Sequence, residues 1–192
     1  MKFPDVDPRT VTRLRDRLAA EADREGVLDI AYRTVDTPVG SLMLVATEQG
    51  LLRVVFEREG HEAVLEHIAD VVSPRILQAA KRLDEPWRQL DEYFAGDRRR
   101  FELPLDLRLA KGFRRTVLDH LPDIAYGQTW SYAQVAAAAG SPRAVRAVGS
   151  ACATNPIPIV VPCHRVVRSD GTYGEYVGSP ENKVRLLTME AA

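Results

Sequence analysis

The stretch Asn155–Val166 constrains the fold of this chain most, because it joins an apolar run, three prolines and two reactive side chains. Each proline fixes its own φ and pushes the residue before it toward extended geometry, so the approach to Cys163 is stiff. The apolar run places the Cys163 thiol at the edge of a hydrophobic core. A free cysteine more often packs as a small buried hydrophobe, so the pair Cys163-His164 alone does not establish a nucleophile.

Length and charge set the outer limits. The 192 residues suffice for one large domain or two small ones. Residues 1–107 carry 16 Lys/Arg and 21 Asp/Glu, a net charge of −5, whereas residues 108–192 carry 10 and 6, a net charge of +4. The second part could therefore meet a polyanion. The start lacks a signal-peptide pattern and the apolar runs are too short to span a bilayer, so we expect a cytoplasmic protein without a membrane partner.

The cysteine count argues against a metal site. The chain has two cysteines, Cys152 and Cys163, and four histidines, and no C-x-x-C pattern occurs. We therefore predict no metal ligands. Cys152 is interpreted as a small helix residue, and a disulfide between the two thiols is not expected in a reducing cytosol.

The chain begins with a predicted short amphipathic helix that lies on the main body. Asp7 fits its N-cap, and Gly26 its end. Val11, Leu14 and Leu18 fall at helical spacing and form its expected apolar face.

An α/β unit with an antiparallel sheet follows. Short turns that contain glycine separate three predicted strands, which we place at Ile30–Val35, Ser41–Thr47 and Leu51–Phe56. Helices are predicted at Glu62–Ala69 and Ile76–Phe94. The second of these shows one apolar face, formed by Leu83, Trp87, Leu90 and Phe94, and Gly96 is its expected stop.

The second part is predicted to be mainly helical. A helix is marked by Phe113, Val117 and Leu121, and Ser131 with Gln134 fits a capping box at the start of an Ala-rich helix. Gly140 turns the chain, and a further helix is predicted over Arg143–Ala153. Helix, short glycine turn, helix is the arrangement of a helix-turn-helix.

The helix Arg143–Ala153 carries almost only small side chains besides its two arginines. A helix that reads the major groove displays Gln, Asn, Ser, Arg and Lys to the base edges, and this one offers little of that kind. Small residues allow close backbone approach, which suits the minor groove. Packing of helix on helix explains the same composition, and Arg146 tips the interpretation toward DNA.

These motifs together resemble the O6-alkylguanine-DNA alkyltransferases, also called methylated-DNA–protein-cysteine methyltransferases. Pro162-Cys163-His164-Arg165-Val166 matches the signature of that family, and the matching segments around it are Tyr93-Phe94-Ala95-Gly96, Ala125–Tyr132, Arg146-Ala147-Val148-Gly149 and Tyr176-Val177-Gly178. The resemblance is strong over residues 87–190 and weaker over 28–86.

The resemblance implies a fold and a domain division. It implies an α/β N-terminal domain that is RNase H-like, with an antiparallel sheet and helices, and a mainly α C-terminal domain with a winged-helix-like helix-turn-helix. We expect an N-terminal helical extension at residues 1–27, the α/β domain at 28–100 and the DNA-binding and catalytic domain at 101–192.

The resemblance also assigns the chemistry. Cys163 would be the nucleophile, His164 would take its proton through a water, and Glu190 would hold His164 in the right tautomer. Asn155 would brace the turn that carries the cysteine. The alkyl group would pass from guanine O6 to sulfur in a single turnover without any cofactor, because a thioether has no activated carbonyl for water to attack.

The implied DNA contacts lie in the minor groove of double-stranded DNA. Arg146 would fill the space of the flipped nucleotide, and Tyr132 would crowd the 3′ phosphate and then donate to guanine N3. Ala144, Ala147 and Gly149 would complete the helix face. We expect a monomer and leave cooperative binding on DNA open.

The implied substrate pocket departs from the family pattern at one wall. Its residues are Val166, Tyr176, Val177, Gly178 and Lys183. Val177 stands where Ser or Gly is common, and Ser179-Pro180 replaces a second glycine, so the range of alkyl sizes stays open.

The sequence also allows other interpretations of function. They are a non-catalytic helix-turn-helix or lesion-sensing protein, a DNA-binding regulator, and a cysteine hydrolase, although adjacent Cys and His are not the hydrolase pattern.

Overall fold

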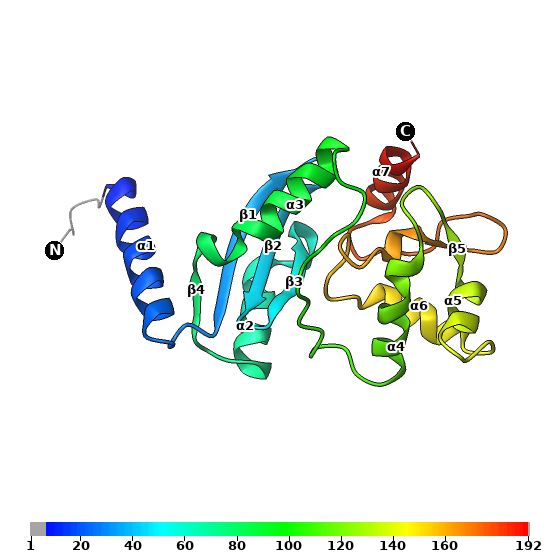
Figure 1. Cartoon of the computed structure of the whole chain (residues 1–192), viewed down its shortest axis with the longest axis horizontal. Helices are drawn as coiled ribbons and strands as arrows, with labels where there is room; N and C mark the ends of the chain where they lie inside the picture. Colours follow the sequence, from blue (N-terminus) through cyan, green and yellow to red (C-terminus); the bar gives the residue numbers. More distant parts are fainter. Residues whose placement is uncertain (1–6, 192) are drawn as a thin grey trace.

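The computed structural model describes residues 7–191 and shows a sheet with its helices at one end and a helical part at the other (Figure 1). The sheet has the order β3-β2-β1-β4. Strands β1 (Ile30–Thr37), β2 (Gly40–Thr47) and β3 (Gly50–Phe56) pair antiparallel, which confirms the predicted meander. Strand β4 (Ile76–Gln78) pairs parallel with β1, so the sheet is mixed.

Both faces of the sheet are covered because successive side chains of a strand point to opposite faces. On one face, buried residues such as Met43 and Val55 pack against Val64 and Ile68 of α2 (His61–Val71). The other face joins one continuous core that runs through α3 (Asp84–Ala95) into the second part of the chain.

The predicted helix Ile76–Phe94 was wrong in its first half. Residues 76–78 form β4, residues Ala80–Leu83 form a 3-10 turn, and α3 begins only at Asp84. Pro86 explains this start: its missing N–H is tolerated in a first turn, whereas inside a longer helix it would break a hydrogen bond. The end was predicted correctly, since Gly96 caps α3 with φ +85°.

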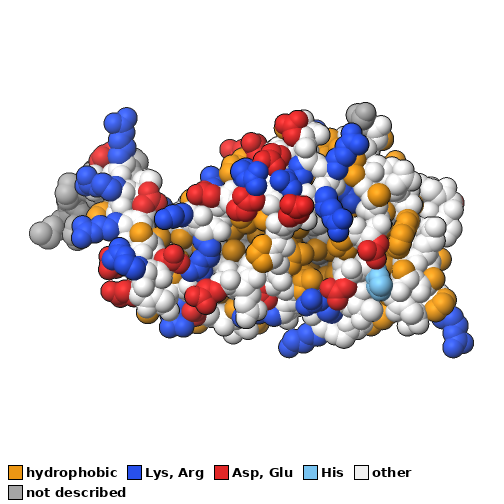
Figure 2. Space-filling model, viewed as in Figure 1, with side chains coloured by type: hydrophobic (Ala, Val, Ile, Leu, Met, Phe, Trp, Pro, Cys, Tyr) orange, Lys and Arg blue, Asp and Glu red, His pale blue; other side chains and the backbone are white. Residues whose placement is uncertain are grey.

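The helix α1 (Pro8–Arg24) is capped by the Asp7 side chain as predicted, but it packs through another face than expected. Ala19 is buried, whereas Leu14 and Leu18 are 54% and 56% exposed. Small residues let α1 approach β4 closely, and Arg82, in the 3-10 turn that follows β4, forms an ion pair with Asp23 of α1. Figure 2 shows Lys and Arg side chains around this helix. The first six residues of the predicted extension lie outside the described residues.

The second part contains four helices among residues 7–191: α4 (Phe113–His120), α5 (Tyr132–Ala138), α6 (Val145–Ala153) and α7 (Pro180–Glu190). The capping box at the start of α5 is confirmed, because Ser131 Oγ accepts from the Gln134 amide and the Gln134 side chain accepts from the Ser131 amide. α6 begins two residues later than predicted. Short strands β5 (Trp130–Ser131) and β6 (Val166–Val167) pair parallel.

The connection between the two parts runs along the edge of β3. The Leu51 amide donates to the Pro104 carbonyl and the Asp106 amide donates to the Leu51 carbonyl, both at 2.9 Å. A Cβ on Gly50 would lie 2.1 Å from the Pro104 oxygen, so this close approach requires glycine. Apolar surface gathers in a hollow of about 470 Å³ beside this connection, lined in part by Phe101, Leu103 and Tyr126 (Figure 2). Among the described residues, no helix has the length and apolar character needed to cross a bilayer.

Candidate functional site: a buried cysteine with a histidine–glutamate pair

The turn that leads to Cys163 is organised around the side chain of Asn155. Its Nδ2 donates to the Val161 carbonyl at 2.8 Å and to the Cys163 sulfur at 3.1 Å, and its Oδ1 accepts from the Ile157 amide at 3.0 Å. Ile159 has φ +74°, a costly conformation for a β-branched residue. The hydrogen bonds of Asn155 hold this turn in place.

Cys163 opens a 3-10 turn, Cys163–Arg165, and is only 2% exposed. Burial raises the pKa of its thiol to about 11, although the Asn155 hydrogen bond and the Lys183 charge act in the opposite direction. The thiol is therefore protonated at neutral pH, and it needs a base before it can act as a nucleophile.

His164 follows Cys163 directly and is fully buried. Its Nε2 lies 2.9 Å from Glu190 Oε1, and because an ionised carboxylate only accepts, Nε2 carries the proton. Among residues 7–191, Nδ1 has no hydrogen-bond partner, so it is the nitrogen left to take a proton. Burial lowers the pKa of His164 against the pull of Glu190, which keeps the imidazole neutral and able to act as a base.

Glu190 lies near the end of α7 and accepts from five donors. Oε1 accepts from His164, Tyr93 and Arg165, and Oε2 accepts from Arg165 and from the Gly127 amide. Burial would raise the pKa of Glu190, but the hydrogen bonds from His164 and Arg165 outweigh it and hold the pKa well below its usual range. Glu190 is thus ionised at neutral pH beside His164.

Two of the side chains that donate to Glu190 were not predicted as site residues. Arg165 belongs to the matched signature, and its Nη1 also donates to the Ile124 carbonyl at 2.6 Å. Tyr93 belongs to the matched segment on α3, and its hydroxyl lies 2.7 Å from Glu190 Oε1. Both stood within the quoted motifs, but nothing in local spacing indicated that they meet a carboxylate so far along the chain.

The predicted pocket residues surround the same centre. Lys183 is fully buried, and its Nζ donates to the Val166 carbonyl at 2.6 Å. This hydrogen bond ties α7 to the strand that follows the Cys163 turn. Tyr176 lies edge-on between Phe56 of β3 and His164, with ring centroids 5.7 and 6.3 Å away.

The wall beyond Tyr176 is tight. A Cβ on Gly178 would lie 2.4 Å from the Phe56 ring, whereas Val177 is half-buried and lines a separate pocket with Asn155. Cys163 and these walls form a closed site.

The predicted DNA-contacting residues lie on α5 and α6, which pack on each other. Arg146 and Ala147 are exposed, Gly149 and Ala144 are partly exposed, and Ala144 is the N-cap of α6. Tyr132 opens α5 and is half-buried. Burial raises the pKa of Tyr132, and the nearby Cys152 and Cys163 act in the same direction. Cys152 is buried within α6, as interpreted from the sequence.

The described residues contain no group of three or more His, Cys, Asp and Glu side chains that could hold a metal ion.

Comparison with known proteins identifies the family to which both parts of the chain belong. The family model described as "6-O-methylguanine DNA methyltransferase, ribonuclease-like domain" matches residues 30–107, and the one described as "6-O-methylguanine DNA methyltransferase, DNA binding domain" matches residues 112–192. The chain thus joins a ribonuclease-like domain to a DNA-binding domain, and the second domain buries a cysteine beside a His–Glu pair. This combination defines the class of DNA alkyltransferases. The chain belongs to the methylated-DNA–protein-cysteine methyltransferase family.

Individual relatives agree over most of their length. The chain is 39% identical to the constitutive methylated-DNA–protein-cysteine methyltransferase of Bacillus subtilis, covering 83% of this chain and 94% of the relative. It is 38% identical to the methyltransferase of Mus musculus, covering 77% and 74%. Crystal structures of the Mycobacterium tuberculosis O6-methylguanine methyltransferase and of Mycobacterium tuberculosis OGT in complex with DNA superpose with TM-scores of 0.74 and 0.72, at 35% and 34% identity. They cover 84% and 83% of this chain, and 93% and 92% of the solved chains. The predicted family and fold class are thereby confirmed.

Proposed function

We propose that this chain is a DNA repair protein that transfers the alkyl group of O6-alkylguanine to Cys163 in a single, irreversible turnover. The observation that carries this proposal is the buried array in which Cys163 precedes His164 and Glu190 fixes that histidine. An intact thiol in such an array does not favour a non-catalytic DNA-binding or lesion-sensing protein.

The array supports a direct displacement. His164 Nδ1 takes the thiol proton through a water, the sulfur attacks the alkyl carbon, and the bond from that carbon to guanine O6 breaks. Asn155 donates to the sulfur and so stabilises the thiolate. Guanine leaves as an anion whose N3 accepts a hydrogen bond from Tyr132, and the proton held by His164 returns through water to neutralise it. The DNA supplies the alkyl group, so the reaction needs no cofactor, and the thioether cannot be hydrolysed.

The substrate has to be a nucleotide turned out of the duplex, because guanine O6 lies inside the base stack. Val166, Tyr176, Gly178 and Lys183 form the proposed pocket, and Val177, whose side chain lines a separate hollow, contributes its backbone amide. Since Cys163 is 2% exposed, the chain around it must open before guanine reaches the sulfur. We propose methyl as the alkyl group that is transferred.

DNA is the partner that the DNA-binding domain at residues 112–192 indicates. We place α6 in the minor groove, with the exposed Arg146 filling the vacated stack and the small residues Ala144, Ala147 and Gly149 against the backbone. The division at residues 28–100 and 101–192, the monomeric state and the cytoplasmic location stay predictions from the sequence.

Labelled substrate tests the function. The protein is mixed with duplex DNA carrying O6-methylguanine with a radiolabelled methyl group, and label on protein is measured against time. We expect at most one equivalent of label on Cys163, and none in Cys163→Ser. Cys152→Ser is the matched control, since that thiol is also buried but lies in α6, and it should accept label as the wild type does. More than one equivalent per molecule, or tight DNA binding without transfer, would contradict the proposal.

The DNA contact is tested separately by Arg146→Ala. This variant should slow transfer from duplex DNA, because no side chain then fills the space that the flipped nucleotide leaves in the base stack. Transfer from free O6-methylguanine base should stay unchanged. Equal loss with both substrates would contradict the assigned role.

A further inference from the structure

We propose that Tyr93, on α3 of the ribonuclease-like part, is a positioning residue for alkyl transfer that holds Glu190 in the orientation His164 requires. The inference rests on the proposed function of the Cys163–His164–Glu190 array. It gives the first part of the chain a direct role at the site, since Tyr93 lies 97 residues before Glu190 in sequence.

The geometry of the carboxylate carries the proposal. The Tyr93 hydroxyl donates at 2.7 Å to Oε1, the oxygen that His164 Nε2 contacts at 2.9 Å. Tyr93 is fully buried, and burial together with the Glu190 charge raises the pKa of its phenol far above the usual value, so the hydroxyl stays a donor. Loss of this donor would leave Oε1 held only by His164 and Arg165.

The ring of Tyr93 is itself fixed. It packs against Phe101 and Tyr126, with ring centroids 5.2 and 6.1 Å away. These ring contacts fix the position of the Tyr93 hydroxyl independently of its hydrogen bond to Glu190. Tyr93 can therefore set the orientation of the Glu190 carboxylate.

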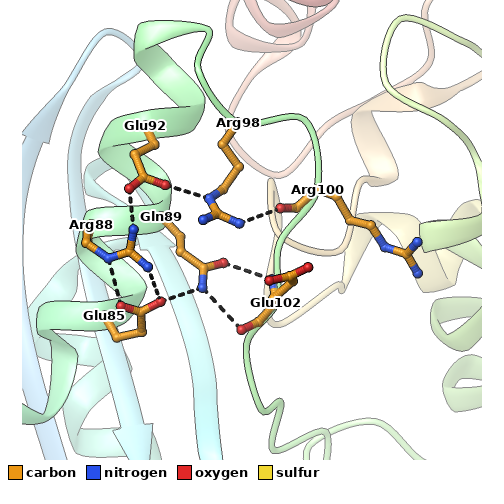
Figure 3. Close-up of polar contacts among 7 residues, drawn as sticks. All are labelled: Glu85, Arg88, Gln89, Glu92, Arg98, Arg100 and Glu102. Carbon is orange, nitrogen blue, oxygen red and sulfur yellow. Dashed lines mark hydrogen bonds and ion pairs between the residues drawn. The ribbon is translucent and has the colours of Figure 1, made fainter.

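The helix that carries Tyr93 is anchored to the connection between the two parts (Figure 3). The buried Gln89 side chain donates to the Glu102 carbonyl at 3.1 Å and accepts from the Glu102 amide at 2.8 Å. Arg98 Nε donates to Glu92 at 2.8 Å, and Arg98 Nη1 donates to the Arg100 carbonyl at 2.9 Å. α3 therefore cannot slide against the segment that leads into the catalytic part.

The charges that face this centre give the expected direction. Glu190 meets His164 and Arg165 from the 3-10 turn and Tyr93 from α3, while His164 is also within the field of Lys183. Without the Tyr93 hydroxyl, Oε1 has one hydrogen-bond donor fewer, so its negative charge acts more strongly on His164, and the carboxylate is free to rotate. The first effect raises the pKa of His164, so that a larger fraction is already protonated and unable to accept the thiol proton.

The test compares Tyr93→Phe with Tyr126→Phe. Both variants remove one hydroxyl next to α7, but the Tyr126 hydroxyl donates to the Met189 carbonyl and not to Glu190. The rate of methyl transfer from O6-methylguanine duplex DNA is measured in single-turnover conditions across the pH range of histidine titration, together with DNA affinity. We expect Tyr93→Phe to slow transfer about tenfold, the effect of losing roughly one hydrogen bond to a charged group. Its acidic limb should move to higher pH with DNA affinity unchanged, and Tyr126→Phe should behave as the wild type.

A purely structural role would lower the melting temperature of Tyr93→Phe while leaving its rate and its acidic limb at wild-type values, and that result would overturn the proposal. A double-mutant cycle with Glu190→Asp adds a second check, because Tyr93→Phe should cost less in that background if it acts through the carboxylate.

NMR of ¹⁵N-histidine-labelled protein follows the His164 titration without DNA. A His164 pKa that is unchanged in Tyr93→Phe would also refute the inference, whereas wild-type protein that transfers no methyl group would refute the proposed function alone.

Discussion

Replacement of Glu190 by Gln is the sharpest perturbation of this site, because it removes one charge and keeps the shape of the side chain. The Glu190 side chain is 0% exposed and both of its oxygens accept hydrogen bonds. A glutamine has only one acceptor oxygen, so its NH₂ must face either the three donors at the Oε1 position or the two at the Oε2 position. Arg165 then remains as a buried cation without its counter-charge.

The size of the effect follows from this count. Breaking a buried ion pair by removing one partner costs about 3–5 kcal/mol. For a chain of this length each kcal/mol shifts the melting temperature by about 2–4 °C, so we expect a fall of roughly 6–20 °C. The imidazolium of His164 also loses its stabilising charge, which should slow methyl transfer by about 10²–10⁴-fold, the range of a lost acid–base catalyst.

Two assays on the same preparations measure this: thermal unfolding by circular dichroism and single-turnover transfer of a labelled methyl group, at a temperature where every variant is folded. Glu181→Gln is the matched control, since Glu181 lies in the exposed first turn of the same helix, and it should change the unfolding free energy by no more than ~0.5 kcal/mol. A Glu190→Gln protein that melts with the wild type and keeps its rate within a few-fold would refute the reasoning.

Three further outcomes are expected. Asn155→Ala should slow transfer by roughly 10–100-fold, because the thiolate loses a hydrogen bond worth ~1.5–3 kcal/mol, and iodoacetamide alkylation against pH should show a thiol pKa above that of the wild type. Gly178→Ala should lower the unfolding free energy by about 1–3 kcal/mol through overlap with Phe56, whereas Gly149→Ala, which meets no atom within 4 Å, should not destabilise in denaturant titrations; equal losses would contradict the packing argument. Because the folded-state pKa of Glu190 is lowered, its stabilisation is present above its unfolded value of 4.5 and is lost as pH falls toward the folded value, so wild-type protein should lose stability below about pH 5 more steeply than Glu190→Gln does.

Features that depend on neighbouring residues were predicted well from the sequence. The Asp7 cap, the Ser131–Gln134 capping box, the Gly96 stop and the three antiparallel strands all follow from contacts between residues close in the chain. The family signature was recognised for the same reason, since it lies in one continuous stretch. Side-chain roles at the site rest on that resemblance and stay predictions that the experiments above address.

Features that depend on long-range partners were missed. β4 exists because its backbone meets the edge of β1, more than forty residues earlier, and its three residues carry too short a pattern to compete with helical periodicity. Leu14 and Leu18 of α1 are exposed because Ala19, a smaller residue, packs against the main body instead.

The same distinction holds at the centre of the molecule. The order of residues along the chain placed Cys163 beside His164, and it identified Glu190 through a family pattern. The five donors on the Glu190 carboxylate come from α3, from the turn at Gly127 and from the 3-10 turn after the cysteine, and packing brings them together. A charge buried from water must find its partners wherever the fold supplies them, so which residues hold Glu190 is a property of the packed molecule and not of its local sequence.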